Sequence, residues 1–450
     1  MREVKARTVF QGWPGVTKLA FQIHDERGNP SMKLFVGLDV SKAKLDVCFL
    51  SREDDSNTVI WQETVPNSDA GATMIKDQIL HFHEELEFDK ILVGMEATGQ
   101  YSIHPALFFS NDPELQLINV QTIVENPRVI HRFSKVWTEE KNDQLDAKLI
   151  AEFLSTGKHT NTKPREEKFV SLLRLTRTRY QLVRQMTEAQ QHYVENLYYK
   201  CNTLTSDLKA EKISTSVFSS TMIQLMNGDL TMADIRTMQT ADLATLLQKY
   251  GRQRFKDPIK LAKVIRKSVS DSYRLSKLAQ NTIDINLGVQ MRVIRGFEQE
   301  IKTIDKAIKD IMETIDGAKI LLSIPGIGPV FAGGIIAELG QIDRFDHESK
   351  LAKYAGLYWP KHQSGNYQRE NNPMSKSGNR YLRYYLVQAA NSVRRHIPEY
   401  EAYYQKKYDE VLKTQHKRAL VLTARKLVRL VFALLSNHQL YIAKSEAIES

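Results

Sequence analysis

Hydrophobic and polar residues follow the pattern of an α/β domain along the first third of the chain. Two apolar runs, residues 33–40 and 44–50, are separated by a short polar turn and predict two strands. Residues 90–96 form a short apolar run typical of a strand buried on both faces, and residues 115–120 are a further strand candidate. Helices are expected near residues 75–85, 103–109 and 141–153.

From residue 166 the apolar positions recur at alternating spacings of three and four, as in helices that pack along one another. The spacing holds over residues 166–200 and again over residues 294–315, which predicts two long helices forming an antiparallel coiled-coil arm. The stretch between them, about 201–290, predicts an all-helical insert with one helix starting at Thr240. Two further helices are expected near residues 381–394 and 417–435.

These patterns divide the chain into successive parts, because 450 residues exceed one ordinary hydrophobic core. Residues 1–31 show no periodicity and predict a loosely held extension that is disordered. We expect an α/β domain over residues 32–160, the arm with its insert over 161–320, and a mainly helical domain over 321–450. The fold class is therefore α/β followed by all-α.

Composition narrows the class of protein. No stretch approaches 18 consecutive apolar residues, and the first residues lack the apolar segment of a signal peptide, so no membrane association is expected. The two cysteines, Cys48 and Cys201, are too few and too far apart for a disulfide framework or a zinc site, which favours a reducing cytoplasm.

The net charge of +10 is concentrated near the C-terminal end. Residues 361–450 contain 16 Lys and Arg against 7 Asp and Glu, whereas the rest of the chain is nearly neutral. Such a region predicts a surface that neutralises phosphates, and a solvated lysine-rich helical face is the alternative.

Acidic residues mark candidate chemistry in the N-terminal domain. Asp39 and Glu96 each close an apolar strand, and open α/β folds bind ligands at the carboxyl ends of their strands. Asp143 and Asp146 share one face of the following helix. Alone, such residues usually form turns or serve the helix dipole. Together, four facing carboxylates favour hard divalent ions, normally Mg²⁺, and two such ions suit phosphodiester chemistry.

A glycine-rich, basic stretch supplies the second candidate region. Residues 324–336 contain the P-G-I-G turn of a helix-hairpin-helix element, with a tight turn between packed helices as the alternative. Aromatic residues then interleave with basic ones, a mixture that suits stacking on bases and gripping a phosphate backbone. The expected nucleic-acid contacts are Lys361, Arg369, Lys376, Arg380 and Arg383. Serines at positions 364, 375 and 377 lie in flexible loops, and chemistry alone does not choose among them.

Three motifs, GLDVSKAKLDV, MEATGQY and KNDQLDAKLIAEF, occur in the order found in the DEDD transposases of insertion sequences. The chain resembles that family, usually called IS110, with its IS1111 branch. The resemblance implies an RNase-H-like, RuvC-like domain with Asp39, Glu96, Asp143 and Asp146 as the catalytic tetrad. AGLYWPKHQSG and PMSKSGNRYLR resemble the family's C-terminal domain, which implies that Ser364 is the nucleophile. The following QREN departs from the family's usual Arg-Gly.

The resemblance also implies a mechanism and partners. The tetrad would hold two Mg²⁺ ions, and Ser364 of another protomer would form a covalent phosphoserine intermediate with DNA. Donor and target DNA, a structured bridge RNA, and homodimers pairing into a homotetramer are the implied partners in a prokaryotic, nucleoid-associated protein. Two alternatives stay open: a RuvC-like Holliday-junction endonuclease that uses water in place of Ser364, and a non-catalytic nucleic-acid-binding scaffold.

Overall fold

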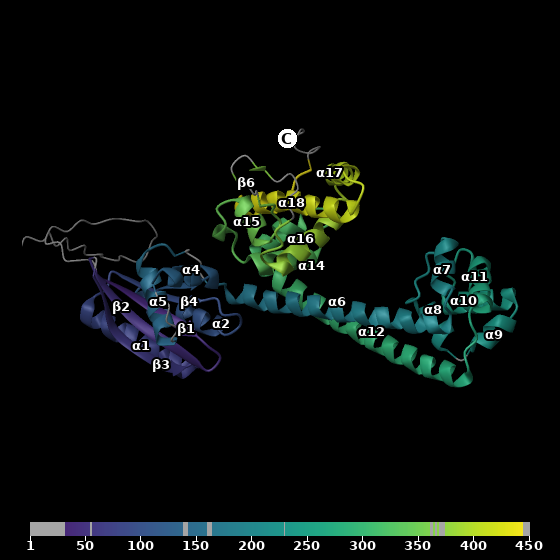
Figure 1. Cartoon of the computed structure of the whole chain (residues 1–450), viewed down its shortest axis with the longest axis horizontal. Helices are drawn as coiled ribbons and strands as arrows, with labels where there is room; N and C mark the ends of the chain where they lie inside the picture. The colour runs from purple at the N-terminus through teal and green to yellow at the C-terminus, as the bar shows by residue number, and fades with distance from the viewer. Residues whose placement is uncertain are drawn as a thin grey trace, which may run out of the picture. The chain divides into compact units, whose positions relative to one another are not determined.

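The computed structural model describes residues 32–54, 56–137, 143–159, 164–228, 230–360, 363–364, 367–368 and 374–443. The chain divides into two compact units, Met1–Glu167 and Lys168–Ser450 (Figure 1). The predicted extension at residues 1–31 lies outside the described residues. Within the described ranges, no helix combines the length and apolar character needed to cross a membrane.

A five-stranded sheet forms the centre of the N-terminal unit. Its strands are β1 (Met32–Val40), β2 (Lys44–Glu53), β3 (Ser56–Pro66), β4 (Lys90–Glu96) and β5 (Gln121–Glu125). They lie in the order β3-β2-β1-β4-β5, with β2 antiparallel to both β1 and β3 and with β1, β4 and β5 parallel. The strands predicted at residues 33–40, 44–50 and 90–96 are confirmed. Strand β3 was not predicted, because most of its residues are exposed and polar.

Five helices accompany the sheet: α1 (Asp69–Leu86), α2 (Ile103–Asn111), α3 (Pro113–Leu117), α4 (Pro127–Trp137) and α5 (Asp143–Ser155). The helices expected near residues 75–85, 103–109 and 141–153 are confirmed as α1, α2 and α5. The prediction of a strand at residues 115–120 was wrong. Asp112 caps a short helix there, since its Oδ1 accepts hydrogen bonds from the amides of Glu114 and Leu115, and Pro113 suits the first helical position.

Helix α5 packs closely on the sheet because glycines remove side chains beneath it. A Cβ on Gly37 would lie 2.1 Å from the carbonyl oxygen of Ala147, and a Cβ on Gly94 would lie 2.5 Å from Leu154 Cδ1. Gln62 Nε2 donates to the carbonyl of Gln144 near the start of α5. The Ser155 carbonyl at its other end accepts from Arg52, towards the amino end of β1. The first turn of α5 therefore lies towards the carboxyl ends of β1 and β4.

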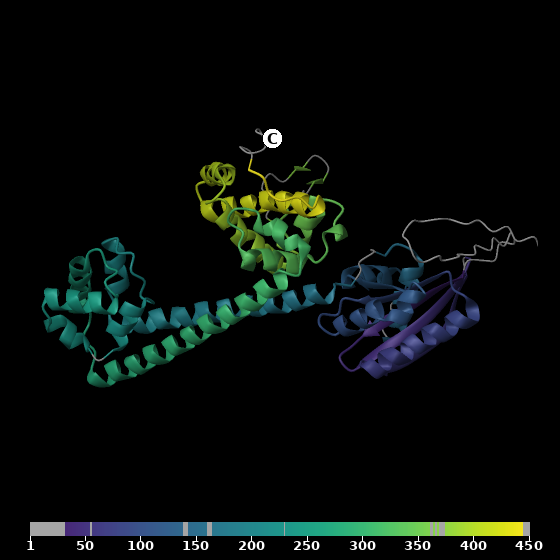
Figure 2. The same ribbon diagram turned by 180° about the vertical axis from the view of Figure 1, so that it is seen from behind.

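Two long helices, α6 (Glu167–Lys200) and α12 (Lys277–Met312), form the arm of the C-terminal unit (Figures 1 and 2). The ion pairs Arg179–Asp305 and Lys200–Asp284 join them. The two predicted long helices are thus present. Helix α12 starts well before the regular heptad spacing because Ser276 caps it, accepting from the amide of Ala279. The insert between them is helical, as expected, and comprises α7 (Leu204–Ala210), α8 (Ser220–Asn227), α9 (Met232–Thr237), α10 (Thr240–Tyr250) and α11 (Pro258–Asp271).

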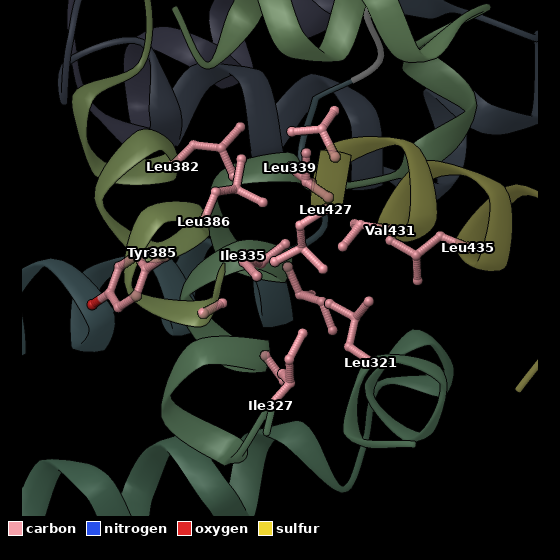
Figure 3. Packing of buried hydrophobic residues seen from close by; sticks show 14 of the residues in the cluster. Leu321, Ile327, Ile335, Leu339, Leu382, Tyr385, Leu386, Leu427, Val431 and Leu435 are labelled. Atoms are coloured by element: carbon pink, nitrogen blue, oxygen red, sulfur yellow. The ribbon is translucent and has the colours of Figure 1, made fainter. Parts of the chain in front are cut away.

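The remaining helices pack around one apolar core, shown in Figure 3. They are α13 (Asp316–Leu322), α14 (Pro329–Leu339), the short 3-10 helix η1 (Ile342–Arg344), α15 (Glu348–Tyr354), α16 (Arg380–Val393), α17 (Pro398–Asp409) and α18 (Gln415–Ser436). Leu321, Ile335, Leu386 and Leu427 come from four of these helices and are fully or almost fully buried. The helices expected at residues 381–394 and 417–435 are confirmed as α16 and α18, and α17 was not predicted.

Candidate functional site

Carboxylates form a row across the sheet on the face that α5 covers. Asp39 on β1 is the register partner of Asp46 on β2, and Glu96 on β4 is the partner of Glu125 on β5. The parallel register of β1 and β4 places Glu96 beside Asp39. Directly opposed residues project from the same face, and Asp39 shares the face of Gly37, two residues earlier, against α5. Four carboxylates therefore follow one another across β2, β1, β4 and β5.

Helix α5 adds Asp146 to this row. Its neighbour Ala147 lies over Gly37, so Asp146 is held near the ends of the two central strands. The effect is electrostatic: the pKa of Glu96 rises from 4.5 to about 7, first because of burial and then because of the negative charges of Asp39 and Asp146. The structure thus brings three of the four predicted acids within electrostatic reach. Asp143 begins α5, and its side chain lies outside the described residues.

The donor set of this site is oxygen only, which suits a hard divalent ion. Among the side chains that the structure describes, no group of three or more His, Cys, Asp or Glu is close enough to hold a metal ion. The mutual repulsion of the described acids is nevertheless what a cation would relieve, since a nearby positive charge stabilises ionised carboxylates. The residues present therefore fit a divalent ion in chemical type and charge.

Asp46 and Glu125 were missed by the sequence reasoning. Asp46 is 1% exposed, its Oδ1 accepts from Thr64 Oγ1 at 2.5 Å, and its Oδ2 lies 3.0 Å from Lys44 Nζ. Glu125 is also buried, and its Oε1 accepts from the amide of Asn126 at 2.8 Å. A signal for Asp46 does exist, because Leu-Asp-Val occurs in both β1 and β2, so a short hairpin can place the two aspartates opposite each other.

The predicted nucleophile belongs to the other unit. Strand β6 (Gln363–Ser364) pairs with β7 (Tyr367–Gln368), so the backbone of Ser364 faces that of Tyr367 in a small antiparallel hairpin. The side chains of this hairpin lie outside the described residues, as do Lys361 and Arg369.

The other three predicted nucleic-acid contacts have different surroundings. Lys376 and Arg380 are exposed, and the Arg380 guanidinium lies 4.8 Å from the ring centroid of Tyr381. Arg383 instead donates to the carbonyls of Ala355 and Lys376, both at 3.0 Å. The guanidinium of Arg383 thus fixes the loop before α16.

A buried polar network supports the same loop from below. Glu338 on α14 is 0% exposed and accepts two hydrogen bonds from Arg177 of α6, at 2.8 and 2.9 Å. Asn379 donates to Glu338 at 2.7 Å, while its side-chain oxygen caps α16. One carboxylate therefore connects the arm, α14 and the start of α16.

The predicted P-G-I-G turn joins α13 to α14. Gly326 has a φ of 92°, and a Cβ there would lie 3.0 Å from the Cα of Val393 at the end of α16. The close packing of this turn against α16 is enough to explain why position 326 is glycine, which agrees with the interpretation of the motif as a tight turn between packed helices.

Two family models match the chain. One, described as the transposase IS116/IS110/IS902 family, matches residues 318–405, and the other, described as a transposase and built on DEDD transposases of the IS110 type, matches residues 36–198. Together the two ranges span more than half of the chain, one in each unit.

Curated bacterial proteins are also similar to the chain. The chain is 27% identical to the insertion element IS116 uncharacterized 44.8 kDa protein of Streptomyces clavuligerus over 335 residues, which are 71% of this chain and 78% of the relative. It is also 27% identical to the transposase for insertion sequence element IS1111A of Coxiella burnetii over 215 residues, covering 46% of this chain and 56% of that protein.

Proposed function

Because the chain belongs to the IS116/IS110/IS902 family of DEDD transposases, we propose that it cuts and rejoins DNA strands to move an insertion sequence. The domain of residues 32–160 would be RNase-H-like and RuvC-like, and it would carry the acidic site. The mixed five-stranded sheet supports this assignment, since its parallel strands β1 and β4 carry Asp39 and Glu96 at their carboxyl ends.

The acids Asp39, Glu96, Asp143 and Asp146 would hold two Mg²⁺ ions. The observation that carries this proposal is the strand register that places Glu96 beside Asp39 under the first turn of α5, which holds Asp146. Burial and the charges of Asp39 and Asp146 raise the pKa of Glu96, in agreement with this arrangement. Bound Mg²⁺ would stabilise charge on the scissile phosphate and on the departing oxygen. The protein's own contribution is to keep the carboxylates on one face of the sheet beneath the first turn of α5.

Ser364 would be the nucleophile for strand cleavage. Its Oγ would form a bond to phosphorus while the bond from phosphorus to a deoxyribose oxygen breaks, and the serine proton would pass to a base as the departing oxygen gains one. The resulting phosphoserine ester would conserve the phosphodiester energy for rejoining. The acids would belong to another protomer, so that one catalytic site combines two copies of the chain.

The partners would be donor DNA, target DNA and a structured bridge RNA. The C-terminal domain of residues 321–450, with the predicted helix-hairpin-helix element at residues 324–336 and with exposed Lys376 and Arg380, would contact nucleic acid. Dimers that pair into tetramers would form through the arm of residues 161–320. An exposed apolar stripe on α12 supports this, since Leu278 is 79% and Ile285 is 66% exposed, with Val289 further along the same face.

The test is strand cleavage and exchange by the full chain, purified with its associated RNA, on DNA carrying the element's ends. Asp146→Asn should abolish cleavage, and Ser364→Ala should abolish the covalent protein–DNA product seen on denaturing gels. Ser377→Ala, which changes another loop serine, is the matched control and should behave as the wild type. Sequencing of the RNA should give one discrete structured transcript.

Each rival function makes a different prediction in this assay. Cleavage that survives Ser364→Ala would identify a junction endonuclease that uses water. Absence of cleavage by the wild type, together with nucleic-acid binding that Asp146→Asn leaves unchanged, would identify a non-catalytic scaffold.

A further inference from the structure

A basic groove lies in the helical insert, away from the proposed catalytic residues in sequence. It has a volume of about 650 Å³ and is formed by two loops, one between α7 and α8 and one between α10 and α11. Lys212, Arg254, Lys256 and Lys260 line it, together with a single carboxylate, Asp257. We call this feature the insert groove.

The charge of the insert groove is only partly neutralised by the protein. Asp257 is engaged as the cap of α11, where it accepts from the amide of Lys260 at 2.8 Å. Lys260 Nζ donates to the carbonyl of Glu211 at 3.0 Å. Lys212, Arg254 and Lys256 are exposed and form no ion pair with any residue of the described ranges. The groove therefore presents an excess of positive charge that an anionic ligand would complement.

The positive surface continues beyond the groove along α11. Lys260, Lys263 and Lys267 recur at spacings of three and four, so they share one exposed helix face, which we call the lysine face. The opposite face of α11 is buried in the insert core, which fixes the direction of the lysine face. Over residues 249–267 the chain has eight Lys and Arg against one acid. This is a longer positive strip than a single phosphate or a mononucleotide needs.

The dimensions and chemistry of the strip fit a phosphate backbone. The lysine face is ~10 Å long at 1.5 Å per helical residue. Duplex DNA carries a negative charge about every 1.7 Å along its axis, so a strip of this length meets several phosphates. The aromatic side chain in the groove is Phe255, which is half-buried beside Gly251. A surface of ammonium and guanidinium groups whose one lining aromatic ring is half-buried suits a duplex backbone better than single-stranded bases, which stack on exposed rings.

We propose that the insert groove and the lysine face bind the backbone of duplex DNA, independently of sequence. The choice of DNA over other polyanions rests on the proposed function, in which donor and target DNA are the substrates. The insert would thus add a DNA contact remote in sequence from both the acids and Ser364. Its contribution would be affinity and orientation of the duplex, because backbone contacts position a protein without reading bases.

The test compares two triple variants of the full chain for binding to a DNA duplex of about 30 base pairs. Lys260→Ala, Lys263→Ala and Lys267→Ala together remove the lysine face. Lys302→Ala, Lys306→Ala and Lys309→Ala remove three exposed lysines from one face of α12, spaced by four and three residues. The acids near them balance the local charge. Fluorescence anisotropy is measured in EDTA, so that binding is read without catalysis, and circular dichroism checks that helix content is unchanged.

Loss of three phosphate contacts has a quantitative signature. The slope of log affinity against log salt concentration should become less steep by about 2.7, which changes the ratio of wild-type to variant affinity ~40-fold between about 50 and 200 mM salt. An unfolded insert would lower the helix content, so this change in salt slope with unchanged circular dichroism excludes unfolding as the cause. As a second variant, Lys212→Ala with Lys256→Ala should reduce the slope by about two without touching any helix.

Three results would overturn the proposal: equal losses in both triple variants, an unchanged salt slope, or a loss confined to an RNA duplex of the same length. The last result would assign the surface to RNA. Failure of the DNA-binding proposal can be distinguished from failure of the proposed function. Strand exchange that survives Asp146→Asn would refute the catalytic assignment, but it would not change the affinities measured for the lysine variants.

Discussion

Glu96→Gln should stabilise the N-terminal unit while removing its activity. Glu96 lies between Asp39 and Glu125 in the row of carboxylates, and its pKa is raised to about 7 by burial and by the charges of Asp39 and Asp146. A carboxyl group whose pKa is higher in the folded chain binds its proton more tightly there. The stability that protonated Glu96 contributes is therefore fully present below its ordinary pKa of 4.5 and is lost as the pH rises towards 7.

The magnitude follows from the size of the shift. At about 1.4 kcal/mol for each pKa unit, ionised Glu96 lowers the free energy of unfolding by at most about 3 kcal/mol near pH 8. Near pH 5 the corresponding cost is about 1 kcal/mol, because folded Glu96 keeps its proton. Glutamine is neutral and nearly isosteric, so Glu96→Gln should raise the stability of the metal-free protein more at pH 8 than at pH 5, by about 2 kcal/mol.

The assay is urea unfolding in EDTA, followed by hydrogen–deuterium exchange of peptides from β1 and β4, which report on the N-terminal unit alone. Glu63→Gln on β3 is the control, since it removes an exposed carboxylate from the same sheet. Saturating Mg²⁺ should stabilise the wild type and diminish the advantage of Glu96→Gln. An equal effect of Glu96→Gln at the two pH values, or destabilisation at pH 8, would refute the reasoning.

Three further predictions concern packing, the buried network and assembly. Gly37→Ala should unfold the N-terminal unit or destabilise it by about 3 kcal/mol, because the new Cβ meets the backbone of α5; thermal unfolding measures this, and a loss below about 1 kcal/mol would contradict it. Glu338→Ala should lower stability by about 2–3 kcal/mol, since it removes the charged hydrogen bonds from the partly exposed Arg177 and the bond from Asn379, and denaturant titration with unchanged stability would refute the network. Ile285→Asp with Val289→Asp should shift the protein to smaller species in analytical ultracentrifugation, whereas unchanged mass would exclude this stripe from the assembly surface.

Much of the N-terminal site was predictable because its signals are local. Near its carboxyl end each of the strands β1 and β4 carries a glycine, one apolar residue and an acid: Gly37 precedes Asp39, and Gly94 precedes Glu96, by two positions. The glycines admit α5, and the period of two puts each acid on the same face. What the sequence could not supply was the register of β4 and β5, which shows that Glu125 extends the row, whereas the repeated Leu-Asp-Val already signals Asp46.

The distribution of basic residues was only partly predictable from the sequence. The basic excess of residues 361–450 suggested one phosphate-binding surface, yet part of it is internal, since Arg394 pairs with Glu401 and Arg425 pairs with Glu348. A second exposed basic surface lies in the insert, within the part of the chain that is nearly neutral overall. Averaging over a long region hides a short helix face, and only the buried side of α11 shows which way its lysines point.

The central claim is that Asp39, Glu96 and Asp146 act together on shared divalent ions, and calorimetric titration with Mn²⁺ near pH 8 tests it most directly. The wild-type chain should bind Mn²⁺ at this site, and Asp39→Asn, Glu96→Gln and Asp146→Asn should each weaken binding by at least about tenfold, while Glu63→Gln should not. Unchanged Mn²⁺ affinity in any one of the three variants would contradict the account.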